Sequence, residues 1–319
     1  MTSDTAISTA GLTKHYPGVR ALNNLSLEVP AGSIFGFLGP NGAGKSTAIK
    51  LLAGLTRPTK GSATVAGVPI DQGAAFRQRV GYLGQEPRFY DWMTGRETLR
   101  FVASLYPAEA HVDDARIDQV LTRVGVADAA DRRTGTYSGG MRQRLGIGQA
   151  IVARPDVLML DEPVSALDPI GRREVLELMQ DLKGEATVFY STHILDDVQR
   201  VSDDVAILDR GHLVAQAPTS ELLASFTKDR LRVVLGGADD STGRLLADVS
   251  GVAQVELADG EDGLRAFVVR TEPDATQLAQ TGITRFAAAN HLSVVENRPE
   301  KLGLEDVFLR LVNTQERAA

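Results

Sequence analysis

Cysteine is absent from this 319-residue sequence. Its absence excludes disulfide bonds, zinc sites built on thiolates and cysteine nucleophiles. Long apolar stretches are missing as well: no run of about 18 apolar residues occurs, so we expect no membrane-spanning helix. The polar start MTSDTAISTAG lacks both the basic region and the apolar core of a signal peptide. We therefore expect the chain to remain in the cytoplasm.

Basic residues are too few to balance the acidic ones. The 34 lysines and arginines face 41 aspartates and glutamates, which gives a formal net charge of −7. No block of lysine and arginine offsets this deficit, so we expect no nucleic-acid partner, although the composition allows a local basic patch. The hydrophobic content of 43% is typical of a protein with a sizeable core, and the length favours two domains.

A glycine-rich stretch, GPNGAGKST at Gly39–Thr47, matches the phosphate-loop pattern G-x-x-x-x-G-K-[ST] at every fixed position. Its glycines allow backbone turns in which successive N–H groups point at phosphate oxygens. The apolar run at 34–38 is typical of a buried strand, and a helix beginning near Lys45 adds the positive end of its dipole. An accidental match is the alternative. We expect nine residues to bind a nucleoside triphosphate here: Gly39, Pro40, Asn41, Gly42, Ala43, Gly44, Lys45, Ser46 and Thr47.

Three side chains of this loop have specific roles in that prediction. Lys45 supplies a positive charge for the β- and γ-phosphates, Ser46 a hydroxyl ligand for Mg²⁺, and Thr47 a hydroxyl within reach of the α-phosphate. Upstream, residues 6–30 predict short antiparallel strands joined by turns. Tyr16 lies on the turn HYPG between them, where its ring either stacks on the face of an adenine or anchors the turn. This segment favours neither role over the other.

Two predicted strands carry acidic or polar groups at their ends. The apolar run at 157–160 ends in Asp161 and Glu162, the profile of a parallel strand buried on both faces. Asp161 suits Mg²⁺ held through water, and Glu162 can orient or deprotonate the attacking water. His193 follows the strand at 187–190 and can donate a hydrogen bond to the γ-phosphate. Surface carboxylates and a structural histidine are the alternatives.

The segment between these motifs changes to a helical period. Gln85 ends a short predicted strand; its amide oxygen either contacts the metal or the attacking water, or belongs to an ordinary polar loop. From 94 to 154 apolar residues recur at helical spacing, with Leu99, Val102 and Leu105 on one face. Within this stretch Ser138 fits a helix N-cap. The two residues after it, Gly139 and Gly140, expose N–H groups that suit an anion, although a capped helix without a ligand is the alternative.

The motifs together resemble the ATP-binding subunit of an ABC transporter, over roughly the first two-thirds of the chain and in the order found in that family. Tyr16 matches the adenine-stacking aromatic loop, Gly39–Thr47 the Walker A loop and Gln85 the Q-loop. The resemblance implies ATP and Mg²⁺ as cofactors and ATP hydrolysis as the reaction.

The later motifs complete the resemblance. Ser138–Gly140 match the signature motif, and Asp161 and Glu162 match Walker B with its catalytic glutamate. Ser165–Asp168 match the D-loop and His193 the switch histidine. The resemblance thereby implies Ser46, Gln85 and Asp161 as groups around the metal, and Glu162, His193 and Gln85 as groups that act in hydrolysis.

The signature departs from the commonest family sequence, LSGGQ, at two positions. Tyr137 replaces leucine and Met141 replaces glutamine. Many members similar to the daunorubicin-resistance exporters have this variant, so the resemblance still implies hydrolysis, and it favours export.

The resemblance also implies two kinds of partner. Two cassettes, in a homodimer, pack head to tail, so that Ser138–Gly140 of one cover the ATP held by Lys45 and Ser46 of the other. Separately encoded membrane subunits provide the transport path, and the chain lies at the inner face of the cell membrane. We expect those subunits to dock near 85–95. The apolar side chains of Phe89, Tyr90, Trp92 and Met93 either form part of a groove for a cytoplasmic helix or fill the core of the helical segment.

The character of the sequence changes past about Lys228. Predicted elements follow the order β-α-β-β-α-β up to residue 296, which suggests a ferredoxin-like domain, and a helix around Leu304–Leu311 closes the chain. We therefore expect a P-loop NTPase core of the ABC ATPase type at 1–227, with an antiparallel β subdomain and a helical subdomain at about 86–154. A small α+β domain at 228–319 follows, suited to dimer contact or regulation.

Transport by an ABC-type ATPase has alternatives, the first of which is action on DNA or the ribosome. ABC-type ATPases that act on DNA usually have zinc cysteines or a long coiled coil, and those that act on the ribosome usually have two cassettes. This sequence has no cysteine and one phosphate loop. A switch that binds ATP without hydrolysing it is a third alternative, which Glu162 and His193 argue against.

Overall fold

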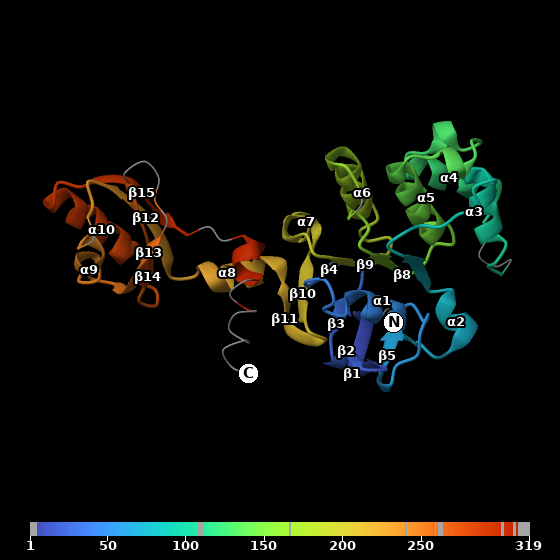
Figure 1. The fold of residues 1–319 in the computed structure, drawn as a ribbon, viewed down its shortest axis with the longest axis horizontal. Coiled ribbons are helices and arrows are strands. Elements are labelled where there is room, and N and C mark those ends of the chain that lie inside the picture. Colours follow the sequence, from blue (N-terminus) through green and yellow to red (C-terminus); the bar gives the residue numbers. More distant parts are fainter. Residues whose placement is uncertain are drawn as a thin grey trace. The chain divides into compact units, whose positions relative to one another are not determined.

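The computed structural model describes residues 5–107, 112–165, 167–239, 241–258, 260, 264–300, 303–308 and 311. The chain divides into two compact units (Figure 1). The first runs to Thr219 and includes Phe308, and the second comprises Ser220–Val307. Helix α8 (Thr219–Thr227), which falls at the end of the predicted ATPase domain, therefore groups almost entirely with the second unit.

A six-stranded sheet in the order β11-β10-β4-β9-β8-β7 forms the centre of the first unit. Neighbours from β10 to β7 are parallel, and β11 is antiparallel to β10. The strands are β4 (Ile34–Leu38), β7 (Val80–Leu83), β8 (Val157–Asp161), β9 (Thr187–Thr192), β10 (Asp204–Asp209) and β11 (His212–Pro218). Strands β4, β8 and β9 are buried along their whole length, as their apolar runs predict.

The parallel register brings several strand ends to one edge of this sheet. Leu38 pairs with Thr192, and Asp161 pairs with Ser191, so the carboxyl ends of β4, β8 and β9 are level. Leu83 at the end of β7 pairs with Leu160 of β8. Ligands of open α/β sheets bind at this edge. The sequence motifs that follow these strands therefore meet there.

A second, antiparallel sheet has the order β2-β1-β5-β6, and β3 pairs with β1. Its strands are β1 (Thr5–Tyr16), β2 (Val19–Leu25), β3 (Glu28–Pro30), β5 (Lys60–Val65) and β6 (Val68–Pro69). Helix α1 (Lys45–Leu52) contacts β8 and β9 of the central sheet and β2 and β5 of this one. One hydrophobic core therefore includes residues of both sheets and of α1.

The helical subdomain contains α3 (Gly95–Ala103), α4 (Asp114–Arg123) and α5 (Gly139–Ile151), with the short 3₁₀ turns η2 (Ala127–Ala129) and η3 (Thr134–Thr136) between α4 and α5. Leu99 and Val102 are buried, as predicted. The expectation for Leu105 was wrong: the helix ends at Ala103, and Leu105 is 69% exposed. Its N–H bonds to the carbonyl of Val102 at 3.0 Å, which turns the chain out of the α-helical path.

The described part of the first unit contains three more helices. They are α2 (Gly73–Arg77), α6 (Pro169–Asp181) and α7 (Leu195–Val201). Asp168 caps α6 by accepting the N–H of Gly171 at 2.9 Å, and Pro169 occupies its first position. Aspartate before proline is a strong helix start, because the carboxylate satisfies a free N–H and proline already has helical φ.

The second unit has the predicted element order: β12 (Arg230–Gly236), α9 (Thr242–Leu246), β13 (Val252–Ala258), β14 (Leu264–Thr271), α10 (Thr276–Ala289) and β15 (Ser293–Pro299). Its antiparallel sheet has the order β13-β14-β12-β15. Helix α9 ends at Leu246, because the N–H groups of Asp248 and Val249 donate to carbonyls three residues earlier, as in a 3₁₀ turn. Leu304–Phe308 are helical, and the remainder of that prediction at 309 and 310 lies outside the described residues.

The second unit has a hydrophobic core of its own. Buried side chains of β12, β14 and α10 form it, among them Leu231, Val233, Phe267, Val269 and Ile283. None of these residues belongs to the core shared by the two sheets of the first unit. Separate cores are the physical basis for treating the units as domains.

Candidate functional site

A cavity of about 790 Å³ lies at the carboxyl edge of the central sheet. It combines the loop after β4 with residues that follow β7, β8 and β9, together with part of strand β2. Its lining residues are Val19, Arg20, Ala21, Asn41, Gly42, Gly44, Lys45, Ser46, Thr47, Gln85, Glu162, Ser165, His193 and Arg210. The structure therefore brings together the phosphate loop, Gln85, Glu162 and His193, as the sequence predicts.

The loop needs glycine where it enters helix α1. Gly44 has φ of 107°, and a Cβ there would lie 2.3 Å from the carbonyl oxygen of Ala21. Any other residue would be strained and would clash. Gly44 is also the N-cap of α1, and no side chain caps this helix. The free N–H groups at the helix start, with the helix dipole, therefore suit a phosphate.

Lys45 lines the cavity and is buried. Its ammonium group donates to the carbonyls of Gly39 at 2.7 Å and Pro40 at 3.1 Å, and lies 3.7 Å from Oε1 of Glu162. Burial lowers the pKa of Lys45, whereas the nearby carboxylates of Glu162 and Asp161 raise it in part. A buried ammonium group that two backbone carbonyls hold in place suits binding of an anionic ligand.

Asp161 is buried at the end of β8 and joins two hydroxyl groups. Its Oδ1 accepts from Oγ of Ser46 at 3.0 Å and from Oγ of Ser191 at 2.7 Å. The Ser191 hydroxyl also accepts the N–H of Glu162 at 3.0 Å. Ser191 therefore positions both acidic residues. No sequence motif indicates this role of Ser191, because serine is common at the ends of strands.

Glu162 connects the lysine with the histidine of the site. Its Oε2 lies 3.3 Å from Nδ1 of His193. Its φ of 49° is in the left-handed region, which is uncommon for a buried residue other than glycine. Such strain persists where neighbouring bonds hold it, and here the carbonyl of Glu162 accepts from Oγ of Ser165 at 3.2 Å. This backbone turn directs the carboxylate into the cavity.

Tyr16 occupies the tip of the β1–β2 hairpin, paired with Val19. The hairpin supplies Val19, Arg20 and Ala21 to the cavity, whereas Tyr16 itself is outside the set of lining residues. The ammonium of Lys14 lies 5.0 Å from the centre of the Tyr16 ring. Stacking of this ring on adenine stays a prediction. The hairpin also places Arg20 at the cavity, although no sequence motif indicated this residue.

The signature residues lie at the start of helix α5, as predicted. Ser138 is the N-cap, and its Oγ accepts the N–H of Met141 at 3.2 Å. A Cβ added at Gly139 or Gly140 would meet nothing within 4 Å, so this helix start faces open space. None of Ser138, Gly139 and Gly140 lines the nucleotide cavity among the described residues.

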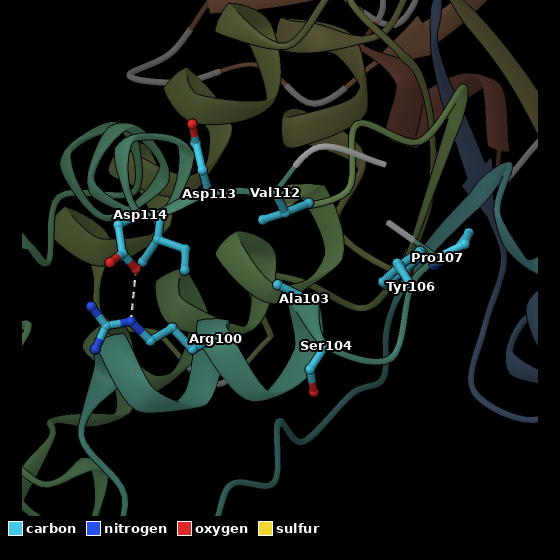
Figure 2. A pocket seen from close by; sticks show the side chains of 9 residues that line it. Arg100, Ala103, Ser104, Tyr106, Pro107, Val112, Asp113 and Asp114 are labelled. Carbon is cyan, nitrogen blue, oxygen red and sulfur yellow. Dashed lines mark hydrogen bonds and ion pairs between the residues drawn. The ribbon is translucent and has the colours of Figure 1, made fainter. Parts of the chain in front are cut away.

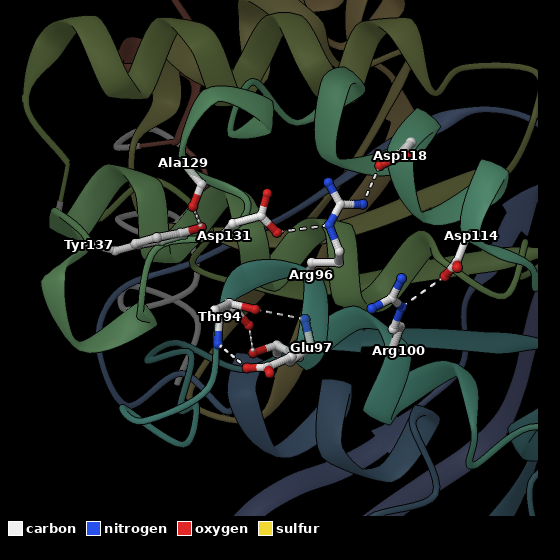
Figure 3. A network of polar contacts seen from close by, with 10 residues as sticks. Thr94, Arg96, Glu97, Arg100, Asp114, Asp118, Ala129, Asp131 and Tyr137 are labelled. Carbon is white, nitrogen blue, oxygen red and sulfur yellow. Dashed lines mark hydrogen bonds and ion pairs between the residues drawn. The ribbon is translucent and has the colours of Figure 1, made fainter.

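Tyr137, one of the two departures from the common signature, anchors the loop before α5. Its buried hydroxyl donates to the carbonyl of Ala129 at 2.6 Å, and burial raises the pKa of this hydroxyl (Figure 3). A Cβ at Gly95 would lie 2.4 Å from the same hydroxyl oxygen, so glycine leaves room for the tyrosine. Next to it, Arg96 forms ion pairs with Asp118 and Asp131. A leucine at position 137 has no hydroxyl for this bond.

A separate cavity of about 550 Å³ lies beside α3 and α4 (Figure 2). Its lining includes the Arg100–Asp114 ion pair, with 2.8 Å between Nε and Oδ1, and Tyr106, whose pKa burial raises. It contains none of the predicted site residues. The candidate nucleotide site is therefore the cavity at the sheet edge.

The parallel sheet, the phosphate loop at the end of β4 and the acidic pair at the end of β8 define a P-loop nucleoside triphosphatase. Three comparisons with known proteins narrow this class. A family model described as ABC transporter matches residues 22–165. The chain is 36% identical over 310 residues to the daunorubicin/doxorubicin resistance ATP-binding protein DrrA of Streptomyces peucetius, which covers 96% of this chain and 92% of that protein.

Other relatives agree with this assignment. The chain is 43% identical over 216 residues, 68% of its length and 72% of the relative's, to the uncharacterized ABC transporter ATP-binding protein YxlF of Bacillus subtilis. A solved structure of an ATP-binding subunit of an ABC transporter has a TM-score of 0.62 at 29% identity, over 70% of this chain and 93% of that one. The chain belongs to the ABC transporter family, as an ATP-binding and ATP-hydrolysing subunit. The resemblance and the core fold class predicted from the motifs are thereby confirmed, and action on DNA or the ribosome is not favoured.

In the described part of the chain, no helix combines the length and the apolar character needed to cross a bilayer.

Proposed function

We propose that two copies of this chain together complete each ATP site. Lys45 and Ser46 of one copy hold the triphosphate, and Ser138, Gly139 and Gly140 of the other copy cover it. The observation that carries this proposal is the position of the signature residues, whose helix start faces open space while the described lining of the nucleotide cavity omits them. Because only the closed pair lets the γ-phosphate contact both copies, ATP favours closure and hydrolysis favours reopening.

Three side chains have proposed roles in hydrolysis. Glu162 orients or deprotonates the attacking water, His193 donates a hydrogen bond to the γ-phosphate, and Gln85 contacts the metal or the water. The 3.3 Å contact between Glu162 and His193 supports the first two roles, because one ligand atom can reach both side chains. The position of Gln85 in the lining of the same cavity supports the third. Tyr16 stacks on the adenine at the tip of its hairpin.

Ser46 and Asp161 are the groups that fit Mg²⁺. Their oxygens lie 3.0 Å apart at the end of the phosphate loop. Mg²⁺ prefers oxygen ligands and usually takes one or two protein groups together with phosphates and water, so this donor set suits it. When bound, the ion neutralises charge on the phosphates. Asp161 also orients the Ser46 hydroxyl, which keeps that oxygen directed at the same position.

An exposed aromatic cluster is the proposed docking surface for the membrane subunits. Tyr90 is 56% and Trp92 65% exposed, and their ring centres are 5.6 Å apart. The ring of Phe101 on α3 lies 6.0 Å from that of Tyr90. Exposed rings of this kind do not fill the core of the helical subdomain, and they suit the apolar face of a partner helix.

Arg142 connects this surface with the signature residues. It lies in the first turn of α5 and forms an ion pair with Asp91 at 3.1 Å. Its guanidinium lies 5.6 Å from the centre of the Phe89 ring. A helix that docks on Tyr90 and Trp92 therefore also contacts the segment 89–92. Phe89 and Asp91 of this segment contact Arg142 at the start of α5. This arrangement supports coupling between transport and closure of the ATP site.

Combined replacement of Tyr90 and Trp92 by alanine is expected to weaken membrane association at least about tenfold, since two interface aromatics each contribute roughly 1–2 kcal/mol. The experiment co-expresses the chain with a membrane protein encoded by a flanking gene and measures co-purification on a tag carried by that protein. Leu55→Ala, at another exposed apolar residue, is the matched control. Equal recovery of the double variant and the wild type would rule out this surface.

Export is the proposed direction of transport, with the chain attached to the inner face of the cell membrane through its partners. Support comes from the relative that spans nearly the whole chain, because its name assigns it to daunorubicin/doxorubicin resistance. A transporter confers resistance to a compound when it removes that compound from the cell.

Residues 1–227 are proposed as the ATPase domain and 228–319 as an accessory domain. A chain that ends at Lys228 is expected to bind ATP within about threefold of the full-length affinity, because groups in separate cores couple by less than about 0.5 kcal/mol. Titration with a fluorescent ATP analogue measures this affinity, and circular dichroism establishes that the truncated chain is folded. Loss of affinity in a folded truncation would contradict the two-domain proposal.

A further inference from the structure

Arg172 and Asp197 form a partly buried ion pair outside the nucleotide cavity. Nε of Arg172 donates to both carboxylate oxygens of Asp197, at 2.8 and 3.0 Å, and Nη2 lies 2.7 Å from Oδ1. The side chain of Asp197 is 4% exposed and that of Arg172 33%. A guanidinium that contacts a buried carboxylate through two nitrogens forms one of the stronger and more directional side-chain contacts. Neither residue lines the nucleotide cavity.

The pair joins the starts of two helices. Arg172 lies in the first turn of α6, and its N–H donates to the carbonyl of Asp168 at 2.9 Å. Asp197 lies in the first turn of α7, which begins two residues after His193. Helix α7 therefore follows the histidine directly, and Arg172 holds its first turn against α6.

The same two helix starts are linked a second time through Glu162. On one side, the N–H and Oγ of Ser165 both donate to the carbonyl of Glu162, at 3.3 and 3.2 Å, shortly before α6 begins. On the other side, the carboxylate of Glu162 lies 3.3 Å from His193. Glu162 is therefore linked to His193 in two ways. One is the direct contact between their side chains, and the other passes along the chain to α6, across the ion pair to α7, and back along the chain to His193.

We propose that Arg172 and Asp197 are positioning residues for ATP hydrolysis, whose ion pair fixes His193 at its distance from Glu162. The inference rests on the proposed roles of Glu162 and His193. Val198 and Val201 of α7 are buried, so we expect apolar packing to keep α7 folded when loss of the pair shifts its start. A displacement of about 1 Å at a reacting centre costs about 10²-fold in rate, and a partial displacement costs less.

The test compares Arg172→Gln with Arg173→Gln in the full-length chain. Arg173 is the next residue on α6, but it is exposed and pairs with Glu177 of its own helix at 2.7 Å. We expect Arg172→Gln to lower kcat about tenfold or more while the Kd for ATP stays within about threefold. Arg173→Gln keeps wild-type values. Arg172→Lys restores part of the rate, because it retains the charge but loses the planar fork.

Asp197→Asn provides a second variant if Arg172→Gln does not fold, because asparagine has the same shape without the charge. Loss of kcat at unchanged ATP affinity in this variant supports the inference. Wild-type kcat in both variants overturns it, as does a parallel loss of kcat and ATP affinity, which indicates a general structural role. If Glu162→Gln also hydrolyses ATP at the wild-type rate, the proposed function fails; if Glu162→Gln is slow and the ion-pair variants are not, only this inference fails.

Discussion

Replacing Glu162 by glutamine is expected to slow ATP turnover about 10²-fold or more and to leave ATP binding intact. Glutamine has nearly the same shape, but it lacks the charge that orients or deprotonates the attacking water, and the magnitude is that of losing one group from the transition state. The backbone of Glu162 is held by Ser191 and Ser165, neither of which contacts its side chain through these bonds. The substitution therefore changes the chemistry with little effect on the loop.

Two measurements separate turnover from binding in this variant. Phosphate release gives kcat, and titration with ATP gives Kd. Glu86→Gln is the matched control, because this carboxylate is 83% exposed, lies 3.9 Å from Arg88 and is not part of the cavity lining. Turnover at the wild-type rate in Glu162→Gln would show that Glu162 does not act in hydrolysis. A loss of ATP affinity as large as the loss of kcat would assign Glu162 to ATP binding instead.

Replacing Asp161 by asparagine is expected to raise the Mg²⁺ concentration for half-maximal turnover by roughly 10- to 100-fold. Asp161 is buried, and its Oδ1 accepts hydrogen bonds from Ser46 and Ser191. Interactions with a charged acceptor contribute roughly 1.5–3 kcal/mol, and each 1.4 kcal/mol is about tenfold in affinity. The measurement is ATP turnover against Mg²⁺ concentration at saturating ATP.

Asp156 provides the control for this prediction. It directly precedes strand β8, at the opposite end from Asp161, and forms an exposed ion pair with Arg79 at 3.0 Å. Asp156→Asn should leave the Mg²⁺ dependence unchanged. An unchanged Mg²⁺ dependence in Asp161→Asn would mean that this carboxylate does not hold the metal.

The central strands and the phosphate loop were predictable because few other local structures are compatible with their sequence patterns. An apolar run such as 157–160 that ends in two acidic residues is typical of a buried parallel strand. The phosphate loop is recognisable because its backbone requires glycine at particular positions, such as Gly44 with its φ of 107°. Parallel pairing then brings Gln85, Glu162 and His193 to one edge. The assembled cavity could therefore be anticipated from the order of the motifs along the chain.

Other features depend on contacts that a linear pattern does not contain. Leu105 continued the helical spacing, yet a single tightened turn moved it to the surface. The double role of Ser191 arises only when β8 and β9 pair. The Arg172–Asp197 contact requires the starts of α6 and α7 to meet, which brings together two residues 25 positions apart in the sequence. The roles of Tyr16, Ser138 and the groups around Mg²⁺ stay predictions, because they need ATP and a second copy.

The claim that two copies complete each site is tested most directly by the molar mass of Glu162→Gln with and without ATP, measured by light scattering on a sizing column. The chain has a mass of 34.1 kDa. We expect ATP to double the measured mass, because the slow variant keeps the γ-phosphate that joins the two copies, and we expect ADP to leave it unchanged. Adding Ser138→Arg, which fills the open helix start, should abolish the shift. A mass of one chain at saturating ATP would contradict the shared site.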